Sequence, residues 1–516
     1  MPKVAGMSNS SSSNIAPSSN SVFACFQDSY ELKRTVRAYI DANETAKKKV
    51  AAIYGWPIGT WCVDEITDFS HLFDGYSMFN EDLNSWNVSR STRMQYMFMG
   101  ALNFNQNLDR WDVSSVESAA KMFAYAEKFN GDITTWNVGK IRDMHGLFLN
   151  AKEFNQDLNA WDVSSVTSME SLFSGHTIPV KFNGNIMAWN TSAVLNMRGM
   201  FTTNRDFDQD IGDWDTSSVT NTVTMFADTG AFNQDIGKWN MSAVLNTHGM
   251  FMGATKFNQS LEAWNVEKVT DMRSMFASAE QFDGNGIGRW KVDRVKSFES
   301  AFVDCIAIAG PNLSSWNTAG CSDMDRMFQG AANFNSDISN WNVSRVSTLV
   351  GMFRGGRNFN QPLQYWDVSG AINMAGMFQN AALFDQNISQ WNVGKCWDFF
   401  DMFLGASRFN QNLASWDVKN AIDLTNMFAD AVDFNQDLCS WSNHFSQRTR
   451  TAGMFVNSSC PFREVSNNNP SSICQECDSS FSAAATTATI TPSCSNIIIL
   501  FVITAMTIFS LPSSLF

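Results

Sequence analysis

The chain of 516 residues is poor in histidine and in runs of basic residues. It has no phosphate-binding loop, HExxH motif or Ser-His-Asp arrangement, and its five histidines are His71, His145, His176, His248 and His444. Lysine and arginine number 36 against 50 aspartates and glutamates, which gives a net charge of −14. This charge argues against binding to nucleic acid and against docking on anionic lipid. We therefore predict a non-enzymatic protein without a cofactor.

The chain also lacks an apolar segment after Met1, so no secretory signal is visible there. Residues 1–25 are rich in serine and asparagine, a composition that predicts disorder. The long apolar run of the sequence is instead at 497–511, and it follows a stretch of Ser, Ala and Thr at 479–496 that we interpret as a stalk. We therefore look for a membrane signal at the C-terminus.

The order of features in this region is typical of a glycolipid (GPI) anchor signal: small residues, a polar spacer, an apolar run and then the chain end. Ser482, followed by Ala483 and Ala484, is the predicted attachment residue, with a spacer of about twelve residues. The alternative is a retained transmembrane helix, but the run is short for a bilayer span and Pro512 follows it. We expect residues 497–516 to attach the chain to the outer face of a cell membrane.

Tryptophan and phenylalanine are abundant and recur at a fixed period. Residues 94–111 read MQYMFMGALNFNQNLDRW, and most of the chain repeats this pattern. The final tryptophan of the pattern recurs every 25 residues, with one step of 28 and two of 26, from Trp61 to Trp441. Self-similarity of this length predicts a stack of repeat units over residues 61–455 and not a set of independent globular domains.

The residues of one repeat predict its local structure. Met94, Met97, Phe98 and Ala101 have the spacing i, i+3, i+4, i+7, which predicts a helix of about two turns. A turn should follow at 104–107, and the β-branched pair at 113 and 116 predicts a short parallel strand. Neighbouring repeats should stack about 4.8 Å apart. The fold class that we predict is an α/β solenoid of about 15 turns, with a core that includes Phe104, Phe129, Trp111, Trp136, Trp161 and Trp264.

Polar residues also form columns. Asparagine follows the phenylalanine in most repeats, and we expect these amides to form a ladder that satisfies backbone groups in the buried turns. Aspartates form two more columns, one with Asp132 and Asp157 and one with Asp112 and Asp162. Calcium bound between turns is one interpretation, but the Gly-Gly-x-Gly-x-Asp signature is absent. We prefer the interpretation that these aspartates are hydrogen-bonding turn residues.

The frame MFxxAxxFNQDLxxWDVSSVT resembles the repeat of the BspA-like surface-protein family, a divergent relative of the leucine-rich repeats. The resemblance covers about residues 61–455. It implies a leucine-rich-repeat-like solenoid exposed on a cell surface, mostly without known enzymatic activity and, for some members, adhesive. The pattern is broken at Ala301 and at 305–311, where we expect the coils to bulge, and an insertion at 175–180 should protrude as a loop.

The two ends of the solenoid differ from the repeats. Residues 26–60 carry a helical stripe and predict an N-terminal cap, with a partner-binding helix as the alternative. Ten cysteines are present, and we expect them to lie outside the repeat columns and near the ends, where disulfides would form in an oxidising compartment. Residues 456–496 form the C-terminal cysteine-containing segment and the stalk. In this segment Cys474-Gln-Glu-Cys477 could instead be half of a zinc site.

Asn-x-Ser/Thr sequons recur, several of them in the same Trp-Asn-x-Ser position. Because asparagine and serine are common in this chain, such sequons also arise by composition, but in a secreted protein they accept glycans. The glycosylation candidates are Asn87, Asn190, Asn240, Asn342 and Asn387. We predict a cell-surface protein that binds a protein or glycan partner through its repeated face, in adhesion. A structural wall or matrix component is the alternative. A hydrolase is disfavoured, because the acidic columns are repeated whereas an active site is singular.

Overall fold

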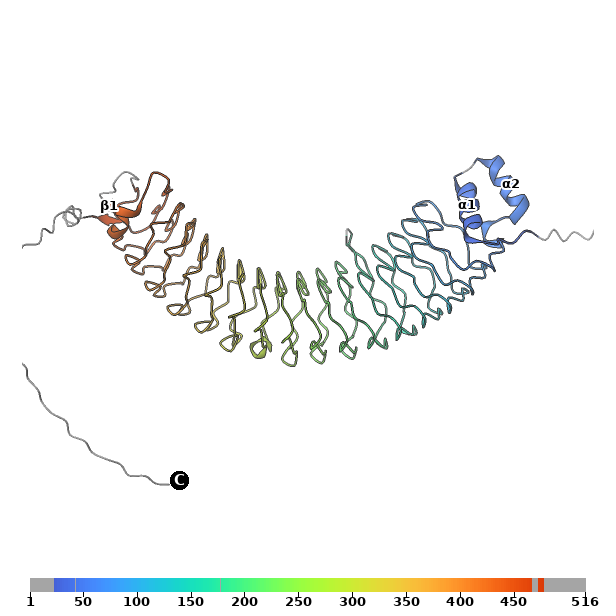
Figure 1. Cartoon of the computed structure of the whole chain (residues 1–516), viewed down its shortest axis with the longest axis horizontal. Helices are drawn as coiled ribbons and strands as arrows, with labels where there is room; N and C mark the ends of the chain where they lie inside the picture. Colours follow the sequence, from blue (N-terminus) through green and yellow to red (C-terminus); the bar gives the residue numbers. More distant parts are fainter. Residues whose placement is uncertain (1–22, 42, 177, 466–471, 478–516) are drawn as a thin grey trace, which may run out of the picture. The chain divides into compact units, whose positions relative to one another are not determined.

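The computed structural model describes residues 23–41, 43–176, 178–465 and 472–477. These residues belong to one compact unit, in which the backbone forms a curved row of stacked coils (Figure 1). Each coil corresponds to one repeat of the sequence. Residues 478–516 lie outside the described residues. The predicted anchor residue Ser482 and the predicted 497–516 tail therefore lie outside them as well.

Two helices lie at the N-terminal end of the row, α1 (Ser29–Ile40) and α2 (Glu44–Tyr54). Both begin at a residue that accepts a backbone hydrogen bond: Asp28 accepts the N–H of Glu31, and Asn43 accepts the N–H of Ala46. One face of α1, with Leu32, Val36 and Tyr39, is buried. Tyr39 packs against Trp61 of the first coil at 5.3 Å between ring centroids, so α1 covers the end of the core.

The helix expected at 94–101 is wrong, because the structure has a run of turns there. Between Met94 and Gly100 every second N–H donates to a carbonyl of the next coil, as Tyr96 does to Ala120 at 3.0 Å. From position 97 on, the alternate N–H groups donate to carbonyls three residues earlier, as Met99 does to Tyr96 at 3.2 Å. Tyr96 and Gly100 have positive φ angles of 60° and 70°, which a helix does not allow. The segment therefore divides its hydrogen bonds between its own turns and the neighbouring coil.

The strand expected around Val113 and Val116 is also wrong. The Val116 N–H donates to the Val113 carbonyl at 2.9 Å and closes a turn. Parallel pairing occurs elsewhere in the coil, as isolated single-residue bridges such as Arg93 to Ser118. The remaining elements of the described chain are the 3₁₀ helices η1 (Ile58–Thr60), η2 (Ile287–Arg289) and η3 (Cys439–His444), and the antiparallel pair β1 (Ser472–Ile473) and β2 (Gln475–Glu476).

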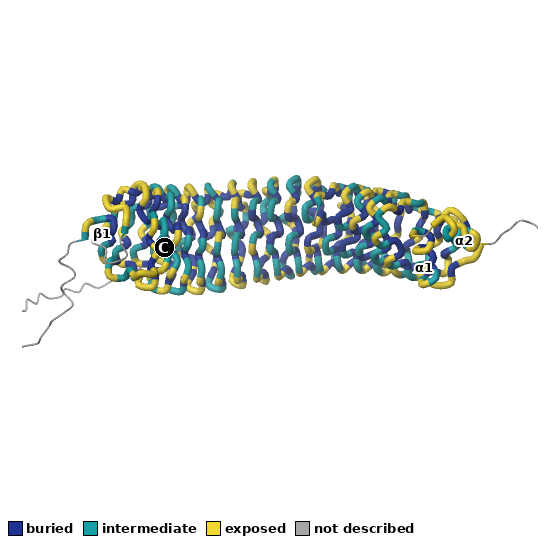
Figure 2. The backbone as a smooth tube through the Cα atoms, turned by 90° about the horizontal axis from the view of Figure 1, so that it is seen from above, coloured by how far each residue is buried: buried dark blue, intermediate teal, exposed yellow. Residues whose placement is uncertain are grey.

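Three columns of stacked aromatic rings fill the core. They run through the positions of Phe98, Phe104 and Trp111, and within a coil Phe98 stacks on Phe104 at 4.1 Å. From Trp86 on, each core tryptophan donates its indole N–H to a carbonyl of the preceding coil, as Trp111 does to Leu83 at 2.9 Å. Figure 2 shows that buried residues recur in every coil between more exposed edges. The residues predicted for the core, Phe104, Phe129, Trp111, Trp136, Trp161 and Trp264, are all buried.

The spacing of these columns explains the curvature. Ring centroids are 5.4 Å apart from Phe98 to Phe123, 5.8 Å apart from Phe104 to Phe129 and 6.3 Å apart from Trp111 to Trp136. All three spacings exceed the expected 4.8 Å, and they widen away from the turn segment, where backbone hydrogen bonds hold the coils together. We call the side of the turn segment the inner side of the curve, and the side of the tryptophans the outer side.

Three disulfides lie near the ends of the unit: Cys25–Cys62, Cys439–Cys477 and Cys460–Cys474. The last two use the thiols that a zinc site at Cys474 and Cys477 would need. The expectation that cysteines avoid the repeat columns is wrong for three of them, since Cys305, Cys321 and Cys396 are buried free thiols within coils. Each takes the place of a small apolar residue in the core, which a thiol resembles in size and polarity.

The asparagines after the phenylalanines form the ladder that the sequence predicts. Asn130 Oδ1 accepts the backbone N–H of Asn155 at 2.9 Å, and the Asn130 N–H donates to Asn105 Oδ1 at 2.8 Å. The glutamine that follows adds a second link, because Gln156 Nε2 donates to the Asn130 carbonyl at 2.7 Å. Aspartate takes the same role at Asp208, whose Oδ1 accepts the N–H of Asn233 at 2.9 Å. Either asparagine or aspartate can thus supply the side-chain oxygen of the ladder.

Candidate binding face

The inner side of each coil has a pair of positions whose residues vary from coil to coil, the first mostly exposed and the second mostly half-buried. They are the positions of Thr92 and Gln95, and we call their residues the variable face. The first position holds Thr67, Thr92, Glu117, Arg142, Thr167, Leu195, Thr220, Leu245, Thr270, Lys296, Ser322, Ser347, Ile372, Trp397 and Ile422. The second holds Ser70, Gln95, Ala120, His145, Glu170, Arg198, Val223, His248, Arg273, Glu299, Asp325, Val350, Ala375, Phe400 and Thr425.

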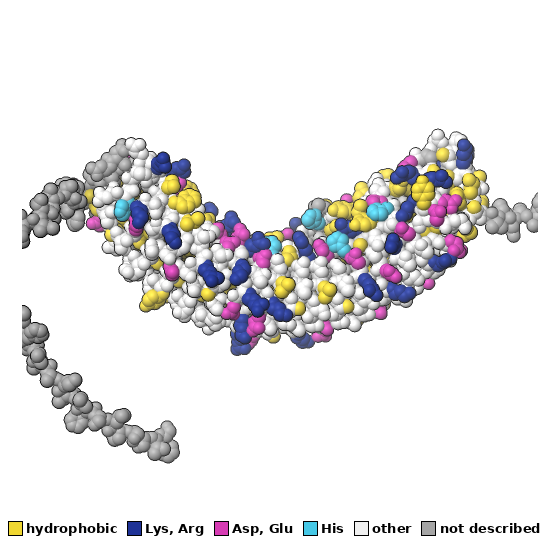
Figure 3. Space-filling view, viewed as in Figure 1, with side chains coloured by type: hydrophobic (Ala, Val, Ile, Leu, Met, Phe, Trp, Pro, Cys, Tyr) yellow, Lys and Arg dark blue, Asp and Glu magenta, His cyan; other side chains and the backbone are white. Residues whose placement is uncertain are grey.

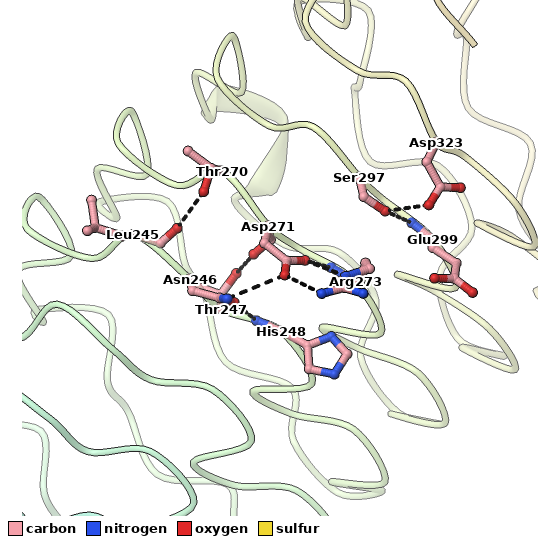
Figure 4. A network of polar contacts seen from close by, with 10 residues as sticks. All are labelled: Leu245, Asn246, Thr247, His248, Thr270, Asp271, Arg273, Ser297, Glu299 and Asp323. Atoms are coloured by element: carbon pink, nitrogen blue, oxygen red, sulfur yellow. Dashed lines mark hydrogen bonds and ion pairs between the residues drawn. The ribbon is translucent and has the colours of Figure 1, made fainter. Parts of the chain in front are cut away.

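A polar column lies between these two positions and holds their backbone. In most coils it is Asp, Asn or Ser, and its side chain accepts the N–H of the residue two positions on. Asn246 Oδ1 accepts the N–H of His248 at 2.8 Å, and its Nδ2 donates to Asp271 of the next coil at 3.3 Å (Figure 4). Such Asx turns fix the local backbone regardless of the neighbouring side chains. Most coils therefore share the same local backbone support, while the flanking residues differ.

The central coils carry a charged zone on this face. Arg273 makes a two-bonded ion pair with Asp271, at 3.0 and 2.8 Å (Figure 4). Burial raises the pKa of Asp271, but the hydrogen bonds and charge of Arg273 outweigh it and leave that pKa below its usual value. One coil further, Arg326 pairs with Glu299 at 2.7 Å. These charges are largely paired within the chain, so this zone offers hydrogen bonds more than net charge.

The coils nearer the C-terminus carry an apolar zone, made of Ile372, Trp397, Phe400 and Ile422. Their exposed fractions are 44%, 41%, 41% and 46%. Trp397 N–H donates to the Ile372 carbonyl at 3.0 Å, and Ile422 N–H donates to the Trp397 carbonyl at 2.8 Å, so the four residues come from three consecutive coils. On the face drawn in Figure 3, hydrophobic side chains gather toward both ends of the inner edge, with a more charged middle.

The outer side contains a cleft where the repeat is irregular. It lies at the two 26-residue coils, has a volume of about 780 Å³, and includes Asp283, Asn312 and the ion pair of Glu262 with Arg289 in its wall. The asparagine ladder is interrupted at Ala309, which has no side-chain oxygen, and the next coil bonds to its backbone carbonyl instead. The expected bulge at 305–311 thus coincides with a local opening of the stack.

The insertion at 175–180 is described except for residue 177. Its last residue, Val180, forms a parallel bridge with Asn204, and the Asn204 amide donates to the Phe182 carbonyl at 2.9 Å. The end of the insertion is therefore tied to the following coil.

The acidic columns serve the turns in which they lie. Asp132 Oδ1 accepts the N–H of Thr134 at 3.0 Å, and Asp112 Oδ1 accepts the N–H of Ser114 at 3.0 Å. Hydrogen bonds from the hydroxyl and then the N–H of Ser114 hold the pKa of Asp112 below its usual value. Within the described ranges, no group of three His, Cys, Asp or Glu side chains is arranged to hold a metal ion.

The glycosylation candidates are all on the surface. Asn87, Asn190, Asn240, Asn342 and Asn387 are exposed, and the Oδ1 of each accepts the N–H of the residue two positions on. The first four follow core tryptophans, and Asn387 lies in the column of Asp132.

Sequence reasoning missed the variable face. Its signal is present in the sequence, as the two positions where aligned repeats differ most in charge and size. The residues that repeat identify the core, whereas these two positions carry no repeated residue and so give no periodic signal. Trp397 in particular is a tryptophan outside the regular column, and its side chain is exposed for that reason.

These features define a class: a repeat protein of stacked coils with a uniform core and a variable inner face. The chain matches the family described as "Mycoplasma protein of unknown function, DUF285" six times, at residues 44–161, 128–211, 167–286, 270–381, 296–403 and 351–469. The chain therefore belongs to the DUF285 family. A comparison with curated proteins finds no match. Across the described part of the chain, no helix is long and apolar enough to cross a bilayer.

Proposed function

We propose that this chain is a non-enzymatic surface protein that binds a protein or glycan partner through its variable face. The observation that carries the proposal is a contrast along the coils: the Asx-turn column recurs in most of them, while the flanking positions range from Arg273 and Glu299 to Trp397 and Phe400. A rigid scaffold that presents varied side chains on one continuous surface suits specific recognition. The resemblance to BspA-like, leucine-rich-repeat-like surface proteins supports the same function.

The apolar zone is the part of this face best suited to contribute binding energy. Exposed aromatic residues grouped with aliphatic ones are typical of the centre of an interface, where truncation of one side chain costs the most affinity. The paired charges of Asp271 with Arg273 and Glu299 with Arg326 would then set orientation and specificity more than affinity.

Two observations support a location on the outer face of a membrane. The three disulfides indicate an oxidising compartment. The order of residues from 479 to 516 is that of a glycolipid-anchor signal, with Ser482 as the attachment residue. Phosphatidylinositol-specific phospholipase C, applied to intact cells, should release the protein. If the protein stays bound and a peptide from 497–516 is recovered by mass spectrometry, the tail is a retained helix.

The binding function is tested with a glycan array and a panel of purified cell-surface proteins, probed with the full chain. The variant Trp397→Ala/Phe400→Ala removes both aromatics of the apolar zone. The matched control is Tyr365→Ala, which removes an aromatic residue that is 81% exposed and lies outside the variable face. A ligand that the double variant loses and the control retains supports the proposal. A chain that binds nothing on either panel supports a structural wall or matrix component instead.

A further inference from the structure

The residue after each core tryptophan forms a column of its own, on the outer half of the coils. Most residues of this column are asparagine or aspartate, and the two residue types make the same contact, whereas Lys291 has no side-chain oxygen. Asn240 Oδ1 accepts the N–H of Ser242 at 3.0 Å, as Asp112 Oδ1 accepts the N–H of Ser114 at 3.0 Å. Where asparagine or aspartate stands at this position, the turn uses the side-chain oxygen, and the contact does not require the amide nitrogen of asparagine.

Asparagines of this column begin Asn-x-Ser sequons at Asn87, Asn190, Asn240 and Asn342. All four are exposed. Among the described residues, the structure records hydrogen bonds to the Oδ1 atoms of these four side chains and none from their Nδ2 atoms. At Asn87, Asn190 and Asn342 the hydroxyl of the sequon serine also donates to Oδ1, at 2.8, 2.8 and 2.7 Å. The amide nitrogens of these exposed side chains therefore make no recorded hydrogen bond within the described chain.

We propose that these four asparagines carry N-linked glycans, an inference that rests on the proposed extracytoplasmic location. The co-reactant is an oligosaccharide linked to a polyprenyl pyrophosphate, presented by a glycosyltransferase. A bond forms between Nδ2 and the anomeric C1 of the sugar, and the bond from C1 to the pyrophosphate oxygen breaks. The pyrophosphate leaves with the electron pair, and a base of the transferase takes a proton from Nδ2.

Not every sequon asparagine leaves its amide nitrogen without a hydrogen bond. Asn457 Nδ2 donates to Asp430 at 2.9 Å, and Asn258 Oδ1 accepts the N–H of Asp283 in the ladder at 3.1 Å. Modification of the four asparagines after the tryptophans, in contrast, leaves the recorded hydrogen bonds of the described chain unchanged, and Asn387, which is bonded through Oδ1, shares this property.

The position of the column has a consequence for binding. The tryptophans mark the outer side of the curve, and Asn87 lies five residues before Thr92, with a turn between them. Glycans at this column would coat the outer half of the coils and leave the variable face open. Asn190 and Asn240 are two coils apart, with tryptophan ring spacings of 6.1 and 6.5 Å in between, so their glycans would stand side by side.

The test uses the full chain purified from its own cells, with glycopeptide mass spectrometry before and after treatment with peptide-N-glycosidase. The expected result is a glycan on each of the four asparagines, converted to aspartate by the enzyme. In an expressed chain, Asn240→Asp should remove one glycan and leave Tm unchanged, because aspartate closes the same turn at Asp112. Ser242→Ala should remove the same glycan while it keeps the asparagine.

The outcomes separate this inference from the proposed location. If the four peptides are recovered unmodified from a chain whose Cys460–Cys474 disulfide is formed, the glycan inference is wrong and the surface location stands. If the chain is found in the cytosol with reduced thiols, both are wrong.

Discussion

The indole Nε1 of Trp264 donates a hydrogen bond to the backbone carbonyl of Ile236 in the preceding coil, at 3.0 Å. The same ring stacks on Trp290 of the next coil, at 6.3 Å and with an interplanar angle of 3°. Trp264 thus joins its coil to both neighbours. Stability in such an array is the sum of coil and nearest-neighbour terms, so damage should spread locally first.

Trp264→Ala should lower the free energy of unfolding by about 3–5 kcal/mol, because it leaves a cavity in a well-packed core. Trp264→Phe should cost less, about 1–3 kcal/mol, since it keeps a ring but leaves the Ile236 carbonyl without its donor. Hydrogen exchange should show lost protection between 239 and 290, whereas Tyr365→Ala should leave protection unchanged. If Trp264→Ala leaves protection in that region intact, the tryptophan column does not hold the coils together.

The asparagine ladder offers a sharper comparison within one position. Asn130→Ala removes the acceptor of the Asn155 N–H and should cost about 1–3 kcal/mol in the free energy of unfolding. Asn130→Asp keeps that acceptor, as Asp208 does in another coil, and should cost much less. Thermal unfolding of the pair measures the difference. Equal losses in the two variants would mean that the ladder contributes through the shape of its side chains and not through the side-chain oxygen.

Acid should weaken the fold through the turn aspartates. Hydrogen bonds from the serine two residues on lower the pKa values of Asp112, Asp162, Asp215 and Asp367 in the folded chain. A lowered pKa adds stability above the unfolded pKa, and that stability is lost as the pH falls through the folded pKa. Tm should therefore decline below about pH 5.

The matched variant for this prediction is Asp162→Asn, made in a host that does not glycosylate. Asparagine closes the same turn at Asn240 and does not titrate, so this variant should show a shallower decline of Tm with acid. If the pH profile of Tm is unchanged in this variant, the acid sensitivity comes from other carboxylates.

The columns of the core could be predicted from the sequence, but the backbone conformation of the residues in them could not. Met94, Met97, Phe98 and Ala101 have helical spacing, but a run of turns with i-to-i−3 hydrogen bonds brings the same residues to one side. The positive φ angles of Tyr96 and Gly100 decide between the two, and no side-chain pattern reveals them for a tyrosine. The ladder was predictable because one Asn position per repeat must satisfy a backbone group. The variable face was not predicted, because periodicity identifies what recurs and the binding residues are those that differ.

The buried thiols should be unreactive in the native protein. Burial raises the pKa of Cys305 to about 12, of Cys321 to about 11 and of Cys396 to about 12. Thiolate is the reactive form, so alkylation of these three at pH 8 should be slow and should become fast in denaturant. Peptide mapping reads each site separately. Rapid native labelling of Cys396 would show that the coils around it open readily.

The most direct test of the central claim is the affinity of a ligand found in the binding screen, measured for the full chain and for single variants. Trp397→Ala should raise the dissociation constant about tenfold or more, as expected for a residue at the centre of an interface. Tyr365→Ala, on a surface outside the variable face, should leave it unchanged, and both variants should keep the Tm of the parent chain. Equal affinity for all three proteins would contradict a binding role for the variable face.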